Sequence, residues 1–418
     1  MTDTRTPVQT PVQTPFQDPD LGLGLGLDLD LAPDLDPDPD PDLRREPASN
    51  PDQDYADRVV AFIDAHPDLV AADRWEEPAI PPVRELIAAL GAAGLLRDAW
   101  PDKGRVGRSP LCLALGRAIQ LHTAFARAGN GAPGAAVLTH LEVGTRLLAH
   151  HPAYLDGLLD GTTTISLAAT EPDGGSDLAG LSTTVRRVDG RLTVSGEKWF
   201  ISNAPFADLL LVLADDPEQA TGPRSGPALL LVAVAGGGVK VEPLAGSGHT
   251  GLTGSIVLDD APVLEVLAPA GQGLLTLMRH WIHERVMLSV RMTEIAAAVL
   301  DDAVSGARRR RTFGAPLLTN QHVRFVLAEL SAEVSEVRSA ALQGVRLLVE
   351  GACTAAFAAM CKYRASVLLR RVADESLQLA GADGYRTGHP AERALRDGLG
   401  LALAGGTDEL MLMQIGRG

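Results

Sequence analysis

Residues 170–177 read TEPDGGSD and residues 196–203 read GEKWFISN, and these two runs decide the fold. They are joined by a predicted β-hairpin, because alternating stretches flank the dipeptide Asp189-Gly190, which favours a tight turn. Glycines and hydroxyls are concentrated in the first run, and two aromatic residues stand in the second. Such residues let a backbone approach a polar, anionic cofactor closely and offer a face for a flat ring. The pair therefore predicts a cofactor site.

The chain changes character several times along its length. Residues 1–54 are low in complexity, and residues 55–162 and 269–418 carry apolar residues at three- and four-residue spacing. Residues 163–268 hold short β runs bounded by glycine and proline. Residues 321–350 contain no proline and carry an apolar stripe, which predicts a long bundle helix. We therefore expect an α+β multidomain fold, with an N-terminal helical domain, a central antiparallel β domain and a C-terminal helical bundle.

Acidic residues are concentrated in the N-terminal tail. The 418-residue chain has a formal net charge of −16, and nine aspartates lie between Asp18 and Asp42 with no lysine or arginine among them. Alternate prolines block helix and sheet, and the aspartates repel one another, so we expect residues 1–54 to be disordered. The tail is either an interaction segment or a dispensable extension. The charge argues against a nucleic acid as partner.

The spacing of the cysteines and the hydropathy of the chain indicate the cellular compartment in which the protein is expected. Cys112, Cys353 and Cys361 are scattered without the spacing of a metal site or a disulfide framework. No uninterrupted apolar stretch reaches the roughly 18 residues that span a bilayer. The first residues lack a charged leader followed by an apolar segment, so we expect a cytoplasmic protein with no bound metal and no membrane span.

The two runs together resemble the flavin-binding segments of the acyl-CoA dehydrogenase family, and the resemblance extends from about Tyr55 to the C-terminus. It implies the acyl-CoA dehydrogenase fold, with a C-terminal four-helix bundle, and FAD as cofactor. The aromatic residue in the second run is commonly tryptophan in the family, and a phenylalanine stands there in this chain. A glycine-rich turn beside a core aromatic is the structural alternative. The residues of the two runs that the resemblance places at FAD are Thr170, Gly175, Ser176, Phe200 and Ser202.

The C-terminal part carries further resemblance. Residues 308–314, an arginine run ending in Thr-Phe-Gly, match a family segment that reaches across a subunit interface to the FAD of a neighbouring protomer. Arginine suits this place because its fork pairs with phosphate oxygens. The resemblance thus implies a homo-oligomer, a dimer or tetramer. It adds as cofactor residues Arg310, Phe313, Gln321, Gln378, Gly381, Thr407 and Glu409, and it implies as substrate-binding residues Ser176, Trp281, Arg285 and Gly406.

Oxidation of an acyl thioester between its α and β carbons requires a base for the α-proton. Many family members carry that base as a glutamate immediately before a C-terminal Gly-Thr, where this chain has Gly405. The isovaleryl and long-chain enzymes instead place it in a Glu-Arg pair on the first bundle helix. Glu284-Arg285 stands in the matching context, so the resemblance makes Glu284 the catalytic base.

Helical spacing supports Glu284 independently. The residues that share one face of the expected helix are Leu277, Trp281, Glu284, Leu288 and Ile295. Burial among apolar residues would raise the pKa of the Glu284 carboxyl, as a base that works near neutral pH requires. The alternative is a glutamate held in an internal ion pair with Arg285 or Arg291. His280 and His283 lack metal-ligand spacing and are expected on the helix or along a pocket.

These residues predict an FAD-dependent enzyme that converts an acyl thioester, on coenzyme A or a carrier protein, to the trans-2-enoyl thioester. Glu284 would remove the α-proton and the flavin would accept the β-hydride. By the resemblance, an electron-transferring flavoprotein is the expected acceptor. Two alternatives stay open: a flavin oxidase or monooxygenase of the same fold, and a non-catalytic relative.

Overall fold

The computed structural model of the protein describes residues 51–76, 80–100, 110–178, 180–218, 226–244 and 252–417. Residues 1–50, most of the segment expected as a disordered tail, lie outside the described residues. Helix α1 begins at Pro51, so residues 51–54 of that segment are helical instead. Proline suits the first helical position because no intrahelical bond needs its missing N–H.

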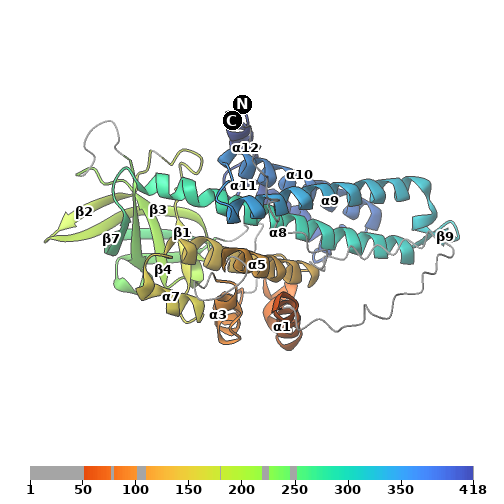
Figure 1. The fold of residues 1–418 in the computed structure, drawn as a ribbon, viewed down its shortest axis with the longest axis horizontal. Helices are drawn as coiled ribbons and strands as arrows, with labels where there is room; N and C mark the ends of the chain where they lie inside the picture. Colours follow the sequence, from red (N-terminus) through yellow and green to blue (C-terminus); the bar gives the residue numbers. More distant parts are fainter. Residues whose placement is uncertain are drawn as a thin grey trace, which may run out of the picture. The chain divides into compact units, whose positions relative to one another are not determined.

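The N-terminal part is helical, as expected (Figure 1). Its apolar faces pack around the large buried side chains Tyr55, Trp75 and Phe125. The segment η3 is a π-helix, a form often found at functional sites. The segments are α1 (Pro51–Ala65), α2 (Pro67–Val70), η2 (Ala72–Arg74), α3 (Val83–Ala92), α4 (Leu95–Asp98), α5 (Pro110–Arg127), α6 (Ala132–Val137), η3 (Leu138–Thr145) and α7 (Pro152–Leu159).

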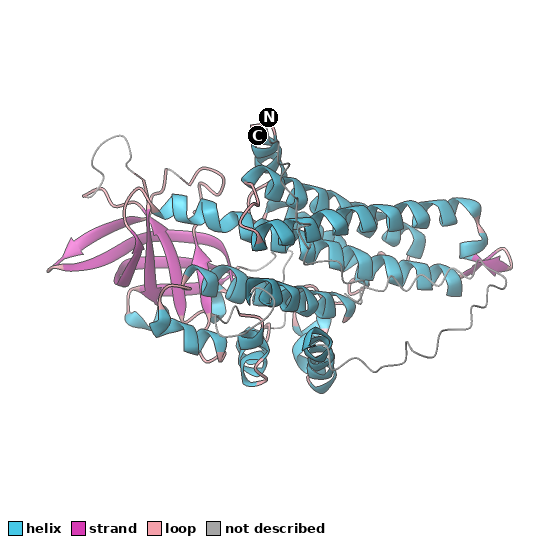
Figure 2. Ribbon diagram, viewed as in Figure 1, coloured by secondary structure: helices cyan, strands magenta, loops and turns pink. Residues whose placement is uncertain are grey.

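The central part is a sheet (Figure 2). Seven strands of the described residues form it in the order β1-β4-β5-β7-β3-β2, with β6 paired to β7. The strands are β1 (Ile165–Ala168), β2 (Thr184–Val188), β3 (Arg191–Ser202), β4 (Leu209–Ala214), β5 (Ala228–Ala233), β6 (Val239–Pro243) and β7 (Thr253–Ala268).

One strand pair departs from the expected antiparallel domain. Strands β1 and β4 run parallel, whereas the other pairs of this sheet are antiparallel. The expectation of a wholly antiparallel domain was therefore wrong for this pair. The chain between Ala168 and Leu209 contains the whole β2–β3 hairpin, and a connection of that length allows a parallel return.

The hairpin of β2 and β3 forms at the predicted turn. Asp189 and Gly190 have φ of 50° and 77°, and positive φ at both central residues is typical of the type I′ turn. Strand β3 then shifts register against β7 between Lys198 and Ile201. The second decisive run therefore contains an irregular bulge, which re-aims the side chains on it.

The C-terminal part is a helical bundle in which α8, α9 and α10 pack against one another (Figure 1). The predicted stripe on α9 is confirmed, since its buried side chains include Val323, Leu327, Leu330, Val334, Val337 and Ala341. The elements are α8 (Gly273–Arg309), β8 (Arg311–Thr312), β9 (Ala315–Pro316), η6 (Leu317–Thr319), α9 (Gln321–Val349), α10 (Ala355–Ala380), α11 (Pro390–Leu403) and α12 (Asp408–Ile415).

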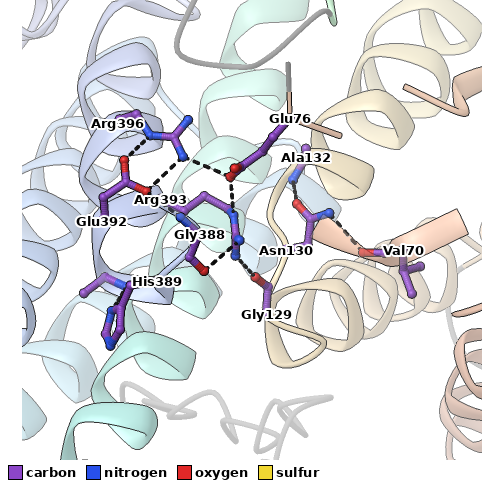
Figure 3. A network of polar contacts seen from close by, with 11 residues as sticks. Val70, Glu76, Gly129, Asn130, Ala132, Gly388, His389, Glu392, Arg393 and Arg396 are labelled. Carbon is purple, nitrogen blue, oxygen red and sulfur yellow. Dashed lines mark hydrogen bonds and ion pairs between the residues drawn. The ribbon is translucent and has the colours of Figure 1, made fainter. Parts of the chain in front are cut away.

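A network of charged groups joins the N-terminal part to α11 (Figure 3). Arg393 Nε lies 2.7 Å from Glu76 Oε1, and Arg396 Nη2 lies 2.9 Å from the same oxygen. Arg396 also pairs with Glu392 at 2.6 Å, and Arg393 donates to Gly129 O at 2.8 Å. Two arginines on one carboxylate fix how the helices before the sheet meet the bundle.

The described residues contain no helix long and apolar enough to cross a membrane. Within the same ranges there is no group of three or more His, Cys, Asp or Glu side chains that could hold a metal ion. Cys353 and Cys361 are free thiols, and burial raises the pKa of Cys361 to about 12.

Candidate active site

The first decisive run forms a tight loop that is bonded to the second. Glu171 N donates to Gly174 O at 2.9 Å, and Gly174 N donates to Glu171 O at 3.2 Å. Trp199 N, on β3, donates to Thr170 O at 3.0 Å. A Cβ on Gly175 would come within 3.1 Å of Thr170 Cγ2, so a side chain there would press on Thr170. Backbone bonds thus bring the two predicted cofactor segments together.

A buried ion pair reinforces this junction. Lys198 Nζ lies 2.9 Å from Glu171 Oε1 and donates to Ala169 O at 3.1 Å. Glu171 Oε2 accepts from Ser182 N at 2.7 Å and from Ser182 Oγ at 2.6 Å. Burial acts to raise the pKa of Glu171, but hydrogen bonds from Ser182, Thr183 and Lys198 lower it to about 2. Burial lowers the pKa of Lys198 to about 8 against the attraction of Glu171, so both groups are charged at neutral pH.

Phe200 projects from the bulge of β3. Its φ is 56°, a left-handed conformation that is strained for an aromatic residue, and its side chain is 61% exposed. The Trp199 ring lies 6.1 Å away and meets it edge-on at 67°. Ser176 is exposed and Ser202 is partly exposed. An accessible aromatic face and free hydroxyls therefore stand on the two segments that the backbone joins.

Glu284 lies on the first half of α8, with a carboxylate that lacks a full set of partners. Its Oε2 is buried and has no hydrogen-bond partner in the described part of the chain. Burial raises the pKa of Glu284 to about 7, against the opposing charge of Arg285. Arg285 donates instead to Gly405 O at 2.9 Å and Gln414 Oε1 at 2.7 Å, and Arg291 donates to a backbone carbonyl. Among the described residues, the internal ion pair considered from the sequence is not formed.

Gly405 stands directly beside that carboxylate. A Cβ built on Gly405 would lie 3.6 Å from Glu284 Oε1 and 2.8 Å from Leu288 Cδ1. The φ of Gly405 is 65°, in the region that favours glycine. A carboxylate carried on residue 405 would therefore reach the same space as the carboxylate of Glu284. The two alternative sequence positions for a base converge on one place in the fold.

Buried cations hold the turn that carries the two glycines. Lys362, which is fully buried, donates to Gly406 O at 2.9 Å and to Asp408 Oδ1 at 3.1 Å. The Arg285 guanidinium lies 5.7 Å from the centre of the Trp281 ring. Lys362 and Asp408 were not predicted from the sequence, although they fix the predicted substrate residue Gly406.

Trp281 lies on α8 three residues before Glu284. It packs against the buried apolar cluster that contains Ala169 and Leu178, which flank residues 170–177. Thr407, the first residue after the paired glycines, caps α12 and accepts from Leu410 N at 3.4 Å. Glu409, on the first turn of that helix, is exposed. Thr407 and Glu409 thus lie at the start of α12, directly after Gly406.

The other predicted cofactor residues form a separate group. Arg310 Nη1 donates to Leu379 O at 2.9 Å and to Ala380 O at 2.7 Å, and a Cβ on Gly381 would lie 2.9 Å from the same nitrogen. Phe313, at the tip of the β8–β9 hairpin, has a φ of 50° and a fully exposed ring. Gln321 and Gln378 are also exposed. The structure thus brings Arg310, Gln378 and Gly381 together.

Arg310 follows the C-terminal end of α8, whereas Glu284 lies in the first half of that helix. At 1.5 Å per residue, the helical path from Glu284 to Arg310 is roughly 39 Å. Within one copy of the chain, Arg310 therefore lies far along α8 from Glu284.

Comparison with known proteins decides the relationship. The family described as "Acyl-CoA dehydrogenase, middle domain" matches residues 166–261, and "Acyl-CoA dehydrogenase, C-terminal domain" matches residues 271–418. Over 260 residues the chain is 31% identical to "Probable acyl-CoA dehydrogenase YdiO" of Escherichia coli strain K12, covering 62% of this chain and 68% of that protein. The chain belongs to the acyl-CoA dehydrogenase family. It is also 30% identical over 273 residues to the short-chain-specific acyl-CoA dehydrogenase of Megasphaera elsdenii, covering 64% and 71% of the two proteins.

Solved structures confirm the predicted acyl-CoA dehydrogenase fold. The acyl-CoA dehydrogenase of Geobacillus kaustophilus superposes with a TM-score of 0.78 at 24% identity, over 89% of this chain and 98% of that one. The butyryl-CoA dehydrogenase of Megasphaera elsdenii gives a TM-score of 0.76 at 24% identity, over 89% and 99%. As a member of the acyl-CoA dehydrogenase family, the chain is an FAD-dependent oxidoreductase. The crowding at Gly175, the exposed Phe200 ring and the free hydroxyls fit that cofactor.

Proposed function

We propose that this acyl-CoA dehydrogenase family member oxidises an acyl thioester to the trans-2-enoyl thioester, with Glu284 as the base that removes the α-proton. The observation that carries the proposal is the Glu284 carboxylate. Its buried Oε2 has no partner in the described part of the chain, burial raises its pKa to about 7, and its Oε1 lies 3.6 Å from the Cβ position of residue 405. A base on α8 would correspond to the isovaleryl and long-chain type.

The residues around Glu284 suit proton removal. Because Oε2 has no partner among the described residues, it can accept a proton without first breaking a hydrogen bond. Leu288, which is buried, keeps the carboxylate in apolar surroundings. Arg285 donates a hydrogen bond to the carbonyl of Gly405, and Lys362 donates one to the carbonyl of Gly406, so the backbone of both glycines is fixed. FAD, when bound, supplies the acceptor for the β-hydride. The residues that would hold the substrate are Ser176, Trp281, Arg285 and Gly406.

Two groups of residues would hold FAD. The first group would consist of Thr170, Gly175, Ser176, Phe200, Ser202, Thr407 and Glu409, and the distant group, around the C-terminal end of α8, would consist of Arg310, Phe313, Gln321, Gln378 and Gly381. Because roughly 39 Å of α8 separates Glu284 from Arg310 in one copy, the distant group would serve the FAD of a second copy. This separation supports a homodimer or homotetramer. The acceptor would be an electron-transferring flavoprotein and the location the cytoplasm.

Replacing Phe313 with alanine should weaken the oligomer and its hold on FAD. Its ring is fully exposed on a strained hairpin tip, so it stabilises little within its own chain. Truncating an aromatic anchor of an interface costs about 2 kcal/mol, which is roughly 30-fold in the dissociation constant. Sedimentation equilibrium and the flavin absorbance of the purified protein measure the two effects. Ile80→Ala, at another exposed apolar side chain, is the control; equal association of both variants would contradict the proposed interface.

The activity should fall as the pH drops through about 7. Only the ionised Glu284 carboxylate can accept a proton, and burial raises its pKa to about 7. Below that pH, kcat/KM should fall by about tenfold for each pH unit. Initial rates between about pH 5 and pH 9 measure it, with flavin absorbance as the check that the cofactor stays bound. A flat profile down to about pH 5 would exclude Glu284 as the base.

The central test is an anaerobic titration of the purified holoenzyme with a panel of acyl thioesters, on coenzyme A and on a carrier protein. We expect at least one thioester to bleach the flavin absorbance and to yield the 2-enoyl product. Substrate-dependent oxygen uptake in air would instead identify an oxidase. Absence of bleaching with every thioester would overturn the proposed function.

A further inference from the structure

Buried polar side chains gather between α8 and η3, next to Glu284. His283 Nε2 lies 2.5 Å from Glu142 Oε2, and Arg146 Nη2 lies 3.2 Å from the same oxygen. The ring of His280 lies 6.2 Å from the ring of His283. Glu142 is 1% exposed and His280 is 9% exposed. We name Glu142, Arg146, His280 and His283 the histidine–glutamate cluster.

Three atoms of the histidine–glutamate cluster have no hydrogen-bond partner among the described residues. They are Glu142 Oε1, Arg146 Nε and His280 Nε2, and Glu284 Oε2 beside them also lacks one. Buried polar atoms are nearly always hydrogen-bonded, and an unpaired one costs about 1–3 kcal/mol. Four such atoms where the end of η3 meets the first half of α8 indicate that their hydrogen bonds are completed by something that binds there.

Helix geometry places the histidine–glutamate cluster on one side of the proposed base. His283 and Arg285 flank Glu284 at about 100° to either side, because an α-helix has 3.6 residues per turn. The Arg285 side is filled by the turn that carries Gly405, and the His283 side faces Glu142. His280 stands four residues before Glu284, so their Cβ atoms are about 5–6 Å apart. A thioester with its α carbon at Glu284 can therefore extend its acyl group to the cluster.

The charges of the histidine–glutamate cluster balance. Burial acts to raise the pKa of Glu142, but Arg146 and His283 lower it to about 2, so it is ionised and paired with the arginine. Burial, aided by His283 and Arg146, lowers the pKa of His280 to about 3, so that ring is neutral. A ligand carboxylate would add an unbalanced buried charge. A hydroxyl fits better, because it can donate to Glu142 Oε1 and accept from the N–H of His280 Nε2 in the tautomer of the neutral ring that carries its proton there.

We propose that the acyl group of the substrate carries a neutral hydrogen-bonding substituent, a hydroxyl beyond the β carbon, which binds between Glu142 Oε1 and His280 Nε2. The proposal rests on the thioester dehydrogenation proposed above and names its substrate class. Glu142 and His280 would then determine specificity, since a site that pairs buried polar atoms with a substrate hydroxyl rejects the analogue that lacks it.

The test compares matched acyl-CoA thioesters that differ only in one substituent: hydrogen, hydroxyl or carboxylate beyond the β carbon. Dissociation constants are measured by calorimetry on the holoenzyme with Glu284→Gln, which cannot remove the α-proton, and kcat/KM by anaerobic flavin reduction on the unmodified protein. We expect hydroxylated thioesters to be favoured by at least about tenfold over unsubstituted ones in both measurements. The carboxylated thioesters should gain nothing.

Substitution of the cluster gives the second arm of the test. His280→Phe removes the unpartnered nitrogen and should abolish the preference for hydroxylated thioesters. Glu142→Gln, which keeps the shape of the side chain, should reduce that preference partly. His151→Phe, at a partly exposed histidine paired with Glu265, should leave the preference intact. Equal binding of hydroxylated and unsubstituted thioesters, as expected if water fills this space, or an unchanged preference in His280→Phe would overturn the inference. Calorimetry tests the hydroxyl site separately from the reaction. If hydroxylated thioesters bound more tightly but none reduced the flavin, the proposed dehydrogenation would be wrong and the proposed hydroxyl site would stand.

Discussion

Replacing Glu284 with glutamine should lower kcat for thioester oxidation by about 10²- to 10⁴-fold, the usual contribution of a positioned general base. Glutamine keeps the size of the side chain but cannot take up the α-proton at neutral pH. The holoenzyme should stay yellow, because the structure gives Glu284 no part in holding the segments around residues 170–177 and 196–203. Stopped-flow flavin reduction under saturating thioester measures the effect.

A matched control and a rescue make this prediction specific. Glu265→Gln, at a surface glutamate paired with His151, should leave kcat unchanged. In a Glu284→Gly protein, Gly405→Glu should restore part of the activity, because a Cβ at 405 lies 3.6 Å from the present Oε1. Recovery should be incomplete, since a side chain at a φ of 65° costs roughly 1–2 kcal/mol. Full activity of Glu284→Gln would exclude this glutamate as the base.

Local patterns in the sequence predicted most of the fold because they report on neighbouring residues. The Asp189-Gly190 turn and the buried stripe of α9 depend only on spacing within one hairpin and one helix, and both are confirmed. The parallel pairing of β1 and β4 depends on the path of the chain between Ala168 and Leu209. Nothing within either strand encodes that path, so the sequence alone predicted an antiparallel pair.

The candidate site also contains residues that local sequence patterns predict and residues that they do not. Glu284 could be predicted because the Glu284-Arg285 pair matches a family segment and the helix face that it shares is apolar. Lys198 could not, because it follows the exposed Glu197 and its partner Glu171 is 27 residues away. The contact between Glu142 and His283 spans 141 residues and leaves no local pattern at either end. Long-range polar contacts are the part of this site that only the structure shows.

Replacing Lys198 with methionine should destabilise the protein by about 3–5 kcal/mol, because removal of one partner leaves the other buried charge uncompensated. Lys198 is fully buried, and Glu171, which is 6% exposed, keeps its negative charge with only the Ser182 and Thr183 bonds remaining. Domains are stable by about 5–15 kcal/mol, so the loss is a large share of the total. The loop 170–177 should also loosen and release FAD. Urea unfolding and the retained flavin absorbance measure the two effects.

The double variant Glu171→Gln with Lys198→Met separates lost charge balance from lost packing. Without either charge, the cost should be smaller than that of Lys198→Met alone, because no unpaired ion stays buried. Lys240→Met is the control, since Lys240 forms an exposed ion pair with Glu242 at 2.7 Å and such pairs add little to stability. If Lys198→Met unfolded at the same urea concentration as Lys240→Met and kept its FAD, the buried ion pair would not be what joins residues 170–177 to residues 196–203. Their alignment would then depend on the backbone bond between Trp199 and Thr170.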